Sequence, residues 1–470
     1  FLKKFSQKLM QNFFQNPTRY DLSQKKRVVF VSFPLYLNTL FNVGNMQLFS
    51  FLKKEFVKNV LTLITGSALS QIIIYVSILL LTRLFSTEIF GIYILFSSAT
   101  LILKPLATLQ YELAIVLTKK DEDAINLLGF SIIVLCCYCV LLIVIIFFFK
   151  ENISSFFNII ALSNIIYALP LSIFLFGCVS IFDYWNNRKN KFKNISKGLL
   201  MKSSVMSTTQ IVTGISPFNS LGLIPGMLLG QFLQLLFLIK ASAQSMLDLT
   251  KKMSLKRMFF LAKKYKEIPI FNTIINLTNN LSNELPVFLI TKYFGLESSG
   301  IYGLAIKFTR APVGIFQQSV SQVFYNKASK VYNEEGDLHK LVIKTAKNLV
   351  LISVFIFIPL FIISFYLDIL FGENWTNVGL YSRILIPWLF FAFLSNPITS
   401  LILILNKQKT IVIYDLLLLI FRFLALFLGY YFYKNIVISL MLFSGIGMLF
   451  NFLIFIYLLK TSKEKKIPYN

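Results

Sequence analysis

The sequence predicts an all-α, polytopic membrane protein of about 12 transmembrane helices in two pseudo-symmetric six-helix lobes, as in V-shaped exporters. Hydrophobic residues make up 56% of the 470 residues and charged residues only 14%, about half the charged fraction of a typical soluble protein. Apolar runs of spanning length recur along the chain, and basic residues gather between them. One segment also repeats at a fixed offset, which indicates two related halves.

Twelve apolar runs are long enough to cross a bilayer, since a transmembrane helix needs about 20 residues. They cover 60–82, 90–110, 125–149, 159–181, 199–217, 221–239, 268–290, 300–325, 348–369, 380–404, 410–431 and 436–459. The run 199–217 is the least apolar, because it carries Lys202 and several Ser and Thr residues.

The runs divide the chain into five parts. Residues 60–239 form the N-lobe, 240–267 a basic cytoplasmic linker, 268–459 the C-lobe and 460–470 a cytoplasmic tail. Residues 1–59 form an amino-terminal extension that we expect to be largely non-native or cytoplasmic. The chain starts at Phe1, and the apolar stretch 28–41 is too short to span.

The distribution of basic residues sets the expected orientation. With a cytoplasmic amino terminus, 36 of the 46 Lys and Arg residues lie in the tails and loops on the cytoplasmic side. Only four lie opposite, namely Arg83, Lys150, Lys292 and Lys434. Because cytoplasmic loops carry an excess of Lys and Arg, both termini are expected in the cytoplasm.

The composition excludes several classes of function. One His and four Cys argue against a His- or Cys-rich metal centre and a disulfide-stapled domain. The net charge of +26 lies in short loops between spans and not on a soluble fold, so no nucleic-acid partner is expected. No Gly-rich loop ends in Gly-Lys-Ser/Thr, which argues against ATP hydrolysis. We expect a secondary transporter with no catalytic residues and no metal or organic cofactor.

An internal repeat marks the two halves. Residues 81–93 (LTRLFSTEIFGIY) align with 290–302 (ITKYFGLESSGIY) at an offset of 209, with six identities in 13 positions. Each segment is the expected outer turn between the first two helices of a half. An offset of six spans gives a parallel repeat, whose halves normally enclose a central pathway and alternate access by rocking.

Polar residues within the runs are costly in a membrane and are therefore functional candidates. In 300–325 they recur at spacings of three and four, which places them on one helical face. The run 268–290 carries an asparagine stripe that is equally typical of interhelical hydrogen bonding. The candidate substrate-binding or cavity residues are Lys307, Arg310, Lys104, Asn272, Asn276, Asn279, Asn283, Glu284 and Gln317.

The intramembrane charge is mainly positive, which favours an anionic cargo such as a phosphate or pyrophosphate. Lys307 and Arg310 are expected to point at one place, with Lys104 nearer the cytoplasm. A second set are candidates for gating or coupling: Arg83, Glu88, Glu112, Asp415 and Arg422. For Asp415 and Arg422, pairing with structural neighbours is the alternative.

Six segments together resemble a known family. They are TRLFSTEIFGIY (82–93), YELAIVLTKKDEDAINLL (111–128), YWNNRKNKFKNISK (184–197), AKKYKEIPIFNTIINLTNNLSNELPVFLI (262–290), SVSQVFYNKAS (319–329) and LFGENWTNVGLYSRILIPWLFFAFLSNPITS (370–400). This series resembles the polysaccharide flippases of the multidrug/oligosaccharidyl-lipid/polysaccharide exporter superfamily, of the O-antigen (Wzx-like) type. The resemblance implies flipping of an undecaprenyl-pyrophosphate-linked oligosaccharide across a bacterial inner membrane.

Two alternatives stay open. A multidrug/toxin extruder of the same superfamily exports mostly cations, so its cavity should be acidic, unlike the basic excess here. A membrane glycan polymerase or ligase needs a large outer loop, and the predicted outer loops are short. The expected partners are the lipid-linked oligosaccharide, membrane lipids and a polysaccharide polymerase machinery, and the driving force is proton or sodium coupling or the membrane potential.

Overall fold

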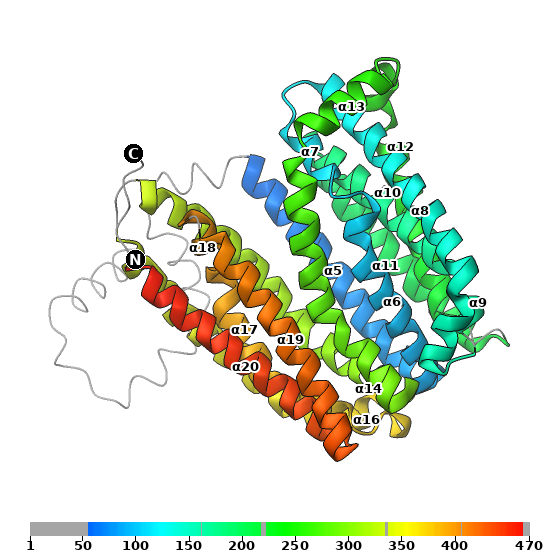
Figure 1. Ribbon diagram of the computed structural model, residues 1–470, viewed down its shortest axis with the longest axis vertical. Helices are drawn as coiled ribbons and strands as arrows, with labels where there is room; N and C mark the ends of the chain where they lie inside the picture. Colours follow the sequence, from blue (N-terminus) through cyan, green and yellow to red (C-terminus); the bar gives the residue numbers. More distant parts are fainter. Residues whose placement is uncertain (1–54, 161, 218–221, 334–336, 406, 464–470) are drawn as a thin grey trace, which may run out of the picture. The chain divides into compact units, whose positions relative to one another are not determined.

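The computed structural model describes residues 55–160, 162–217, 222–333, 337–405 and 407–463. Within these ranges every regular element is a helix, and no strand occurs (Figure 1). The chain divides into two compact units, residues 1–61 and 62–470. The described part of the first unit is the opening of α5 (Glu55–Leu84), and all other helices belong to the second. Most of the predicted extension 1–59 therefore lies outside the described residues.

The helices follow the predicted runs closely. The first half of the second unit continues with α6 (Thr87–Ala107), α7 (Glu112–Leu117), α8 (Asp121–Phe157), α9 (Leu162–Ile165), α10 (Ala168–Arg188), α11 (Phe192–Ile215) and α12 (Leu223–Thr250). The helix α13 (Leu255–Lys264) lies in the connection between the halves. The second half contains α14 (Glu267–Asn333), α15 (Leu338–Ser364), α16 (Leu367–Phe371), η2 (Glu373–Trp375), α17 (Val378–Ser395), η3 (Asn396–Ile398), α18 (Ser400–Ile404), α19 (Gln408–Tyr433) and α20 (Ile436–Thr461).

The chain is a multi-pass membrane protein, although the count of twelve spans is not confirmed. Every predicted run overlaps a helix, and nine helices in the described ranges are long and apolar enough to cross a membrane. The runs without such a helix are 199–217, 268–290 and 300–325, which correspond to α11 and the two limbs of α14. These are the runs with the most polar side chains, which lowers their mean hydropathy.

The helix α14 bends at Gly295, which joins the seventh and eighth predicted runs. Gly295 has φ 88° and ψ 174°, a conformation that L-residues with a side chain rarely adopt. The residues on either side are helical, so the two predicted runs form two limbs of one bent element. The predicted outer turn of the second half is therefore a single glycine kink, whereas in the first half α5 and α6 are separated by a short break capped by Ser86.

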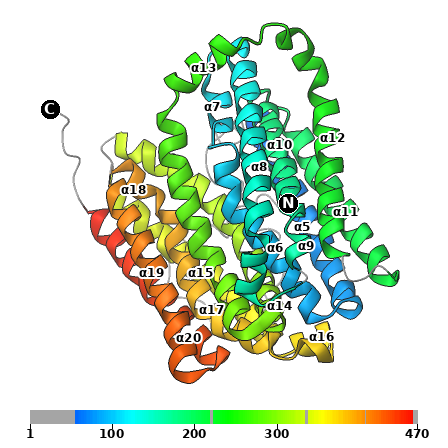
Figure 2. The ribbon, with the colours of Figure 1, turned by 45° about the vertical axis from the view of Figure 1, so that its right-hand side comes forward.

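The buried apolar side chains form two clusters, one for each half. The first is built from residues 96–262 and the second mainly from residues 287–458, joined by the adjacent ends of α5 and α6. Figures 1 and 2 both show α8, α10, α11 and α12 side by side and α17, α19 and α20 in a separate set, with α14 between them. Two cores suit two halves that move as bodies.

The repeated segments pack against each other reciprocally. A Cβ atom on Gly91 would lie 2.1 Å from the backbone oxygen of Leu296, and one on Gly300 would lie 2.1 Å from that of Thr87. The two contacts are equivalent in the repeat: at the offset of 209, Thr87 corresponds to Leu296 and Gly91 to Gly300. The two glycines therefore allow α6 and the second limb of α14 to approach backbone to backbone.

A second reciprocal pair joins α5 to the second limb of α14 and α6 to the first limb. The Tyr75 hydroxyl donates to the backbone oxygen of Lys307 at 2.9 Å, and the Ser98 hydroxyl donates to Glu284 Oε2 at 2.6 Å. Tyr75 corresponds to Glu284 and Ser98 to Lys307 at the same offset. The sequence repeat thus has a structural counterpart in the contact between the halves.

Candidate functional site

A polar cavity with a volume of about 680 Å³ lies within the second half. Both limbs of α14 contribute to its walls, together with α17, η3, α19 and α20. Its lining includes the polar side chains of Asn279, Asn283, Arg310, Gln317, Asp415, Arg422 and Asn451, together with the rings of Trp388 and Tyr414. We call this the second-half cavity.

Arg310 is held by the asparagine stripe of the first α14 limb. Its Nη2 donates to Asn283 Oδ1 at 2.8 Å, and Asn283 Nδ2 donates to Asn279 Oδ1 at 2.8 Å. The guanidinium carbon lies 5.2 Å from the centroid of Trp388. Two asparagines and one aromatic ring therefore orient the cation, and none of these groups neutralises its charge.

Arg422 approaches the same tryptophan. It is only 3% exposed, and its guanidinium carbon lies 4.4 Å from the centroid of Trp388. Nη1 donates to Ser282 Oγ at 3.2 Å, whereas the buried Nε has no hydrogen-bond partner. Trp388 thus contacts two guanidinium groups, each at a cation–π distance.

The cavity contains more positive than negative charge. Asp415 is its one carboxylate lining residue, and in the described part of the chain no carboxylate oxygen lies within 4 Å of either guanidinium. Burying unpaired cations is costly, and two of them near one ring also repel each other. A bound anion would supply the missing counter-charge, and the guanidinium fork suits phosphate oxygens.

Neutral polar groups complete the walls. Gln317 Nε2 donates to the backbone oxygen of Ala392 at 3.0 Å, and Ser395 Oγ donates to Asn451 Oδ1 at 3.0 Å. Asn451 Nδ2 in turn donates to the backbone oxygen of Gly447 at 2.7 Å. Amides and an aromatic ring are suited to contact with sugar hydroxyls and sugar faces.

The structure separates Lys307 from Arg310. Lys307 Nζ lies 4.4 Å from the centroid of Tyr93 in the first half, and Lys307 is absent from the lining of the second-half cavity. A three-residue step on an α-helix turns by about 300°, which leaves the two side chains about 60° apart. The expectation that both cations point at one place is therefore corrected: Arg310 faces the second-half cavity and Lys307 faces the first half.

Lys104 also lies elsewhere, within the first half. Its Nζ is 4.0 Å from the centroid of Phe176 on α10, and Lys202 of α11 lies 5.3 Å from the same ring. Glu112 nearby is 2% exposed and accepts from the Ser180 hydroxyl at 3.3 Å. At Lys104 the helix α6 therefore faces the first half and not the second-half cavity.

The other acidic and amide candidates have local partners. Asn272 and Asn276 donate to backbone oxygens four residues earlier in their own helix. Glu284 accepts from Ser98 across the two halves, as described above. Glu88 is exposed in the first turn of α6, where an acidic side chain favours the helix amino terminus.

Arg83 and Lys292, which correspond in the repeat, each reach into the other half. Arg83 Nη2 donates to the backbone oxygens of Ile369 at 3.0 Å and Leu370 at 3.4 Å. Lys292 Nζ donates to the backbone oxygen of Phe156 at the end of α8. Each acceptor lies at or just after the end of the third span of the opposite half. We call these two contacts the paired latches.

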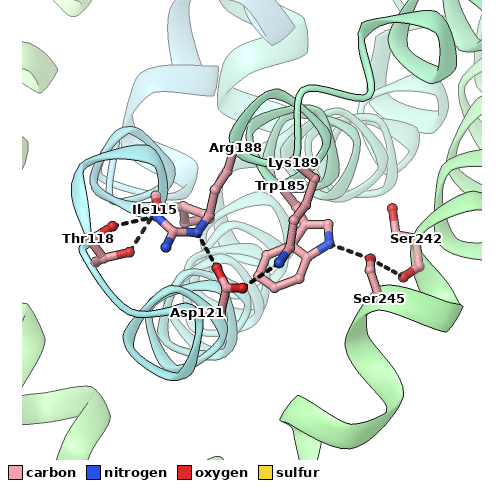
Figure 3. Close-up of polar contacts among 8 residues, drawn as sticks. All are labelled: Ile115, Thr118, Asp121, Trp185, Arg188, Lys189, Ser242 and Ser245. Atoms are coloured by element: carbon pink, nitrogen blue, oxygen red, sulfur yellow. Dashed lines mark hydrogen bonds and ion pairs between the residues drawn. The ribbon is translucent and has the colours of Figure 1, made fainter.

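The opposite end of the first half contains the ion pairs. Arg188 Nε donates to Asp121 Oδ1 at 2.9 Å, and its Nη1 donates to the backbone oxygens of Ile115 and Thr118 (Figure 3). Lys189 Nζ lies 2.5 Å from Asp121 Oδ2. The other ion pairs in the described ranges, Lys252–Glu122 and Arg257–Asp123, lie close by in sequence. This network connects the loops of the first half that were predicted to be cytoplasmic.

Several residues that line the second-half cavity were not predicted from the sequence, among them Trp388, Tyr414 and Asn451. Trp388, Tyr414 and Asn451 lie in strongly apolar runs, where an aromatic or a single amide is usually a packing residue. A signal was available for Trp388, because an intramembrane arginine often stacks on a tryptophan. The sequence did not show which of the three tryptophans meets Arg310.

A chain of this helical architecture, with two reciprocally packed halves and a cationic intramembrane cavity, has the organisation of a membrane transporter. A family model described as polysaccharide biosynthesis protein matches residues 80–379. The match covers more than half of the chain, so the chain belongs to the polysaccharide biosynthesis protein family.

Solved structures show the same fold. The lipid II flippase MurJ in an inward closed conformation has a TM-score of 0.67 at 16% identity, covering 85% of this chain and 90% of that chain. An inward-facing multidrug resistance MATE family transporter of the MOP superfamily has a TM-score of 0.64 at 13% identity, covering 84% and 95%. A MOP superfamily transporter from Pyrococcus furiosus has a TM-score of 0.54 at 12% identity, covering 87% and 96%.

No curated protein matches the chain. The fold is that of MOP superfamily transporters, and the prediction of a flippase-type exporter, not an enzyme, agrees with the family and with these structures.

Proposed function

We propose that the chain is a flippase for an undecaprenyl-pyrophosphate-linked oligosaccharide, such as an O-antigen or other surface polysaccharide unit. It moves this lipid from the inner to the outer leaflet of the bacterial inner membrane by alternating access. The observation that carries the proposal is the pair of guanidinium groups on Trp388. Arg310 and Arg422 lie in one cavity without a carboxylate partner among the described residues.

A pyrophosphate fits this arrangement chemically. It carries several negative oxygens on two linked phosphates, so each guanidinium has oxygens to bind by charge-assisted hydrogen bonds. The Nε of Arg422 is a buried donor without a partner, and an acceptor there would remove the cost of leaving it unpaired. Asn279, Gln317 and Asn451 offer amide groups to the sugars that follow the pyrophosphate.

Alternating access has support from the contacts between the halves. The paired latches and the close approach of Gly91 and Gly300 join the halves at the end where the loops carry few charges. By the charge distribution that end faces the outer side. The similar structures of MurJ and of the MATE transporter have inward closed and inward-facing conformations, respectively. This similarity supports a closed outer end in the present chain.

A multidrug extruder is the second candidate, since a MATE transporter shares the fold and Asp415 lines the cavity. The two candidates differ in the charge of the cargo. A cationic drug would be repelled by Arg310 and Arg422, whereas a pyrophosphate lipid would be attracted. The proposal includes coupling to protons, to sodium or to the membrane potential, and association with a polymerase machinery.

Transport in proteoliposomes tests the proposal. The assay follows the appearance of a tagged undecaprenyl-pyrophosphate oligosaccharide in the leaflet accessible to an added sugar-binding probe. Arg310→Gln and Arg422→Gln should each slow transport at least tenfold, and Arg310→Lys should retain a substantial part of it, because lysine keeps the positive charge that attracts the cargo although it loses the guanidinium fork.

Arg383→Gln is the matched control. Arg383 also stacks on an aromatic ring, Phe365 at 4.4 Å, and donates to a backbone oxygen, but it lies outside the cavity lining. Its variant should transport at the normal rate per folded molecule. Normal transport by Arg310→Gln together with Arg422→Gln would refute the assignment, and export of a cationic drug with no lipid transport would establish the extruder.

A further inference from the structure

The short helix α13 lies in the connection between the two halves and is attached to α8. Its buried face consists of Met258, Leu261 and Ala262. The methyl group of Met258 packs on the backbone of Gly129 in α8, where a Cβ would lie 2.6 Å from it. The Tyr111 hydroxyl donates to the backbone oxygen of Ala262 at 3.3 Å, and Arg257 forms an ion pair with Asp123 at 2.7 Å. α13 is therefore fixed on the first turns of α8.

A second apolar face of α13 has no protein partner over much of its area. Leu255 and Phe259, which form this face, are each 62% exposed. Phe260 is 57% exposed but lies about 100° further around the helix, where the guanidinium carbon of Arg257 is 5.2 Å from its ring. At about 100° per residue, Leu255 and Phe259 lie about 40° apart, next to the buried face. Phe259 contacts Phe130 of α8 edge to face at 5.7 Å, so its exposed ring continues the outer surface of that helix. Large apolar side chains grouped in this way on a ten-residue helix are unfavourable in water.

The position of α13 along α8 matches the edge of a bilayer. α8 has 37 residues, which at 1.5 Å per residue is about 55 Å and exceeds a hydrocarbon core of about 30 Å. The large exposed apolar side chains of α8 begin at Ile133 and are dense from Val140 to Phe149. α13 contacts α8 at Asp123, Gly129 and Phe130, just before this stretch. Figure 1 shows α13 at the end of the first half, beside the ends of α7, α8 and α12.

Basic side chains surround the exposed apolar face. Lys256, Lys263 and Lys264 are exposed, and none of them forms an ion pair within the described residues. By the helical spacing, Lys256 and Lys263 follow directly after Phe259 around the helix, and Lys264 lies on the far side. An apolar face bordered by lysines is the pattern of a helix that lies in the plane of a membrane surface.

We propose that α13 is an in-plane anchor that binds the anionic lipids of the adjacent leaflet. Leu255 and Phe259 enter the boundary between acyl chains and headgroups. The amino groups of Lys256, Lys263 and Lys264 contact headgroup phosphates, and the methylene chains of these lysines lie along the lipid. Because α13 is the covalent connection from α12 to α14, this anchor holds the connection between the halves at the membrane surface. The proposal does not depend on the identity of the transported molecule.

Fluorescence quenching by brominated lipids tests the depth of the helix in the full-length protein in nanodiscs. Phe259→Trp places a reporter on the proposed lipid face, and Lys264→Trp, about 140° around the helix, is the matched control. The three native tryptophans are at most 3% exposed, so the added one dominates the change. Phe259→Trp should be quenched at least threefold more than Lys264→Trp. Equal quenching, or none at position 259, would overturn the insertion and favour a water-exposed or protein-covered helix.

Lipid selectivity tests the lysines. At equal mole fraction, brominated phosphatidylglycerol should quench Phe259→Trp more than brominated phosphatidylcholine, since each basic residue near a surface favours anionic lipid by about fivefold. Lys256→Gln with Lys263→Gln and Lys264→Gln should abolish the preference, and millimolar inorganic phosphate should leave it unchanged. Lys119→Gln with Lys120→Gln and Lys251→Gln, which removes three exposed lysines outside α13, should preserve it. A preference that survives the α13 triple variant, or is equally lost in the control, would overturn the assignment.

Discussion

The paired latches make a quantitative prediction about the equilibrium between conformations. Arg83 and Lys292 are equivalent in the repeat, and each donates to backbone oxygens of the opposite half. Replacing both with glutamine removes the charge and shortens the reach, while each position keeps a polar side chain. The variants leave the second-half cavity intact, because neither residue lines it.

The size of the effect follows from the contacts. A hydrogen bond to a charged group contributes about 1.5–3 kcal/mol when shielded, and Arg83 is exposed, so we assign about 1 kcal/mol to each latch. The two latches use different acceptor residues, so their contributions to the free energy of the closed state should add. Together they favour the closed outer end by about 2 kcal/mol, or roughly 30-fold in the ratio of closed to open molecules.

The assay is the reactivity of a cysteine behind the latches. Thr87 is 7% exposed and packs where Gly300 approaches α6, so Thr87→Cys should be protected from a membrane-impermeant maleimide while that end is closed. In a background without the four native cysteines, the double latch variant should raise the labelling rate by about 30-fold, and each single variant by about fivefold. Lys150→Gln is the control, because Lys150 contacts Tyr167 within its own half at 5.6 Å. A double variant that labels within twofold of the parent would refute the latch assignment.

Two further predictions concern glycines that the fold requires. Gly300→Ala should place a methyl group against the backbone oxygen of Thr87 and lower the free energy of unfolding by about 1–3 kcal/mol. Gly314→Ala, with nothing within 4 Å, should keep or slightly raise the melting temperature, because alanine favours a helix over glycine. Equal melting temperatures for the two variants would contradict the close packing of the halves. Gly295→Ala should cost about 1–2 kcal/mol through its positive φ alone, since no atom lies within 4 Å, and an unchanged melting temperature there would show that the kink is relaxed or absent.

The sequence predicted the helices well because the dominant signal is hydrophobic length. Each apolar run overlaps a helix, and the repeat at 81–93 and 290–302 identified in advance the segments that pack reciprocally at Gly91 and Gly300. The bend at Gly295 was not predicted, because a glycine in a predicted outer turn does not reveal whether the helix stops or only kinks. The helix α13 was not predicted, because in a short linker rich in Lys and Arg the charge is a stronger signal than the amphipathic spacing of ten residues.

The site was predicted only in part, since side-chain direction depends on how each helix is rotated. The spacing of Arg310 and Gln317 and of Asn279 and Asn283 placed each pair on one face, and the structure brings all four to one cavity. Lys307 lies three residues from Arg310 but faces Tyr93, and Lys104 faces Phe176 within its own lobe. Tertiary rotation therefore decided which cations share a site. Arg422 reaches that site through Trp388, a contact that no spacing rule could show.

The most direct test of the central claim is equilibrium binding of an undecaprenyl-pyrophosphate lipid to the protein in nanodiscs, compared with its monophosphate. The account predicts tighter binding of the pyrophosphate to the parent protein. It predicts at least a 100-fold loss in the Arg310→Gln, Arg422→Gln double variant, since each charge-assisted contact contributes about 1.5–3 kcal/mol, and no loss in Arg383→Gln. If the double variant binds the pyrophosphate lipid as tightly as the parent, or if the parent does not distinguish pyrophosphate from monophosphate, the second-half cavity is not the pyrophosphate site.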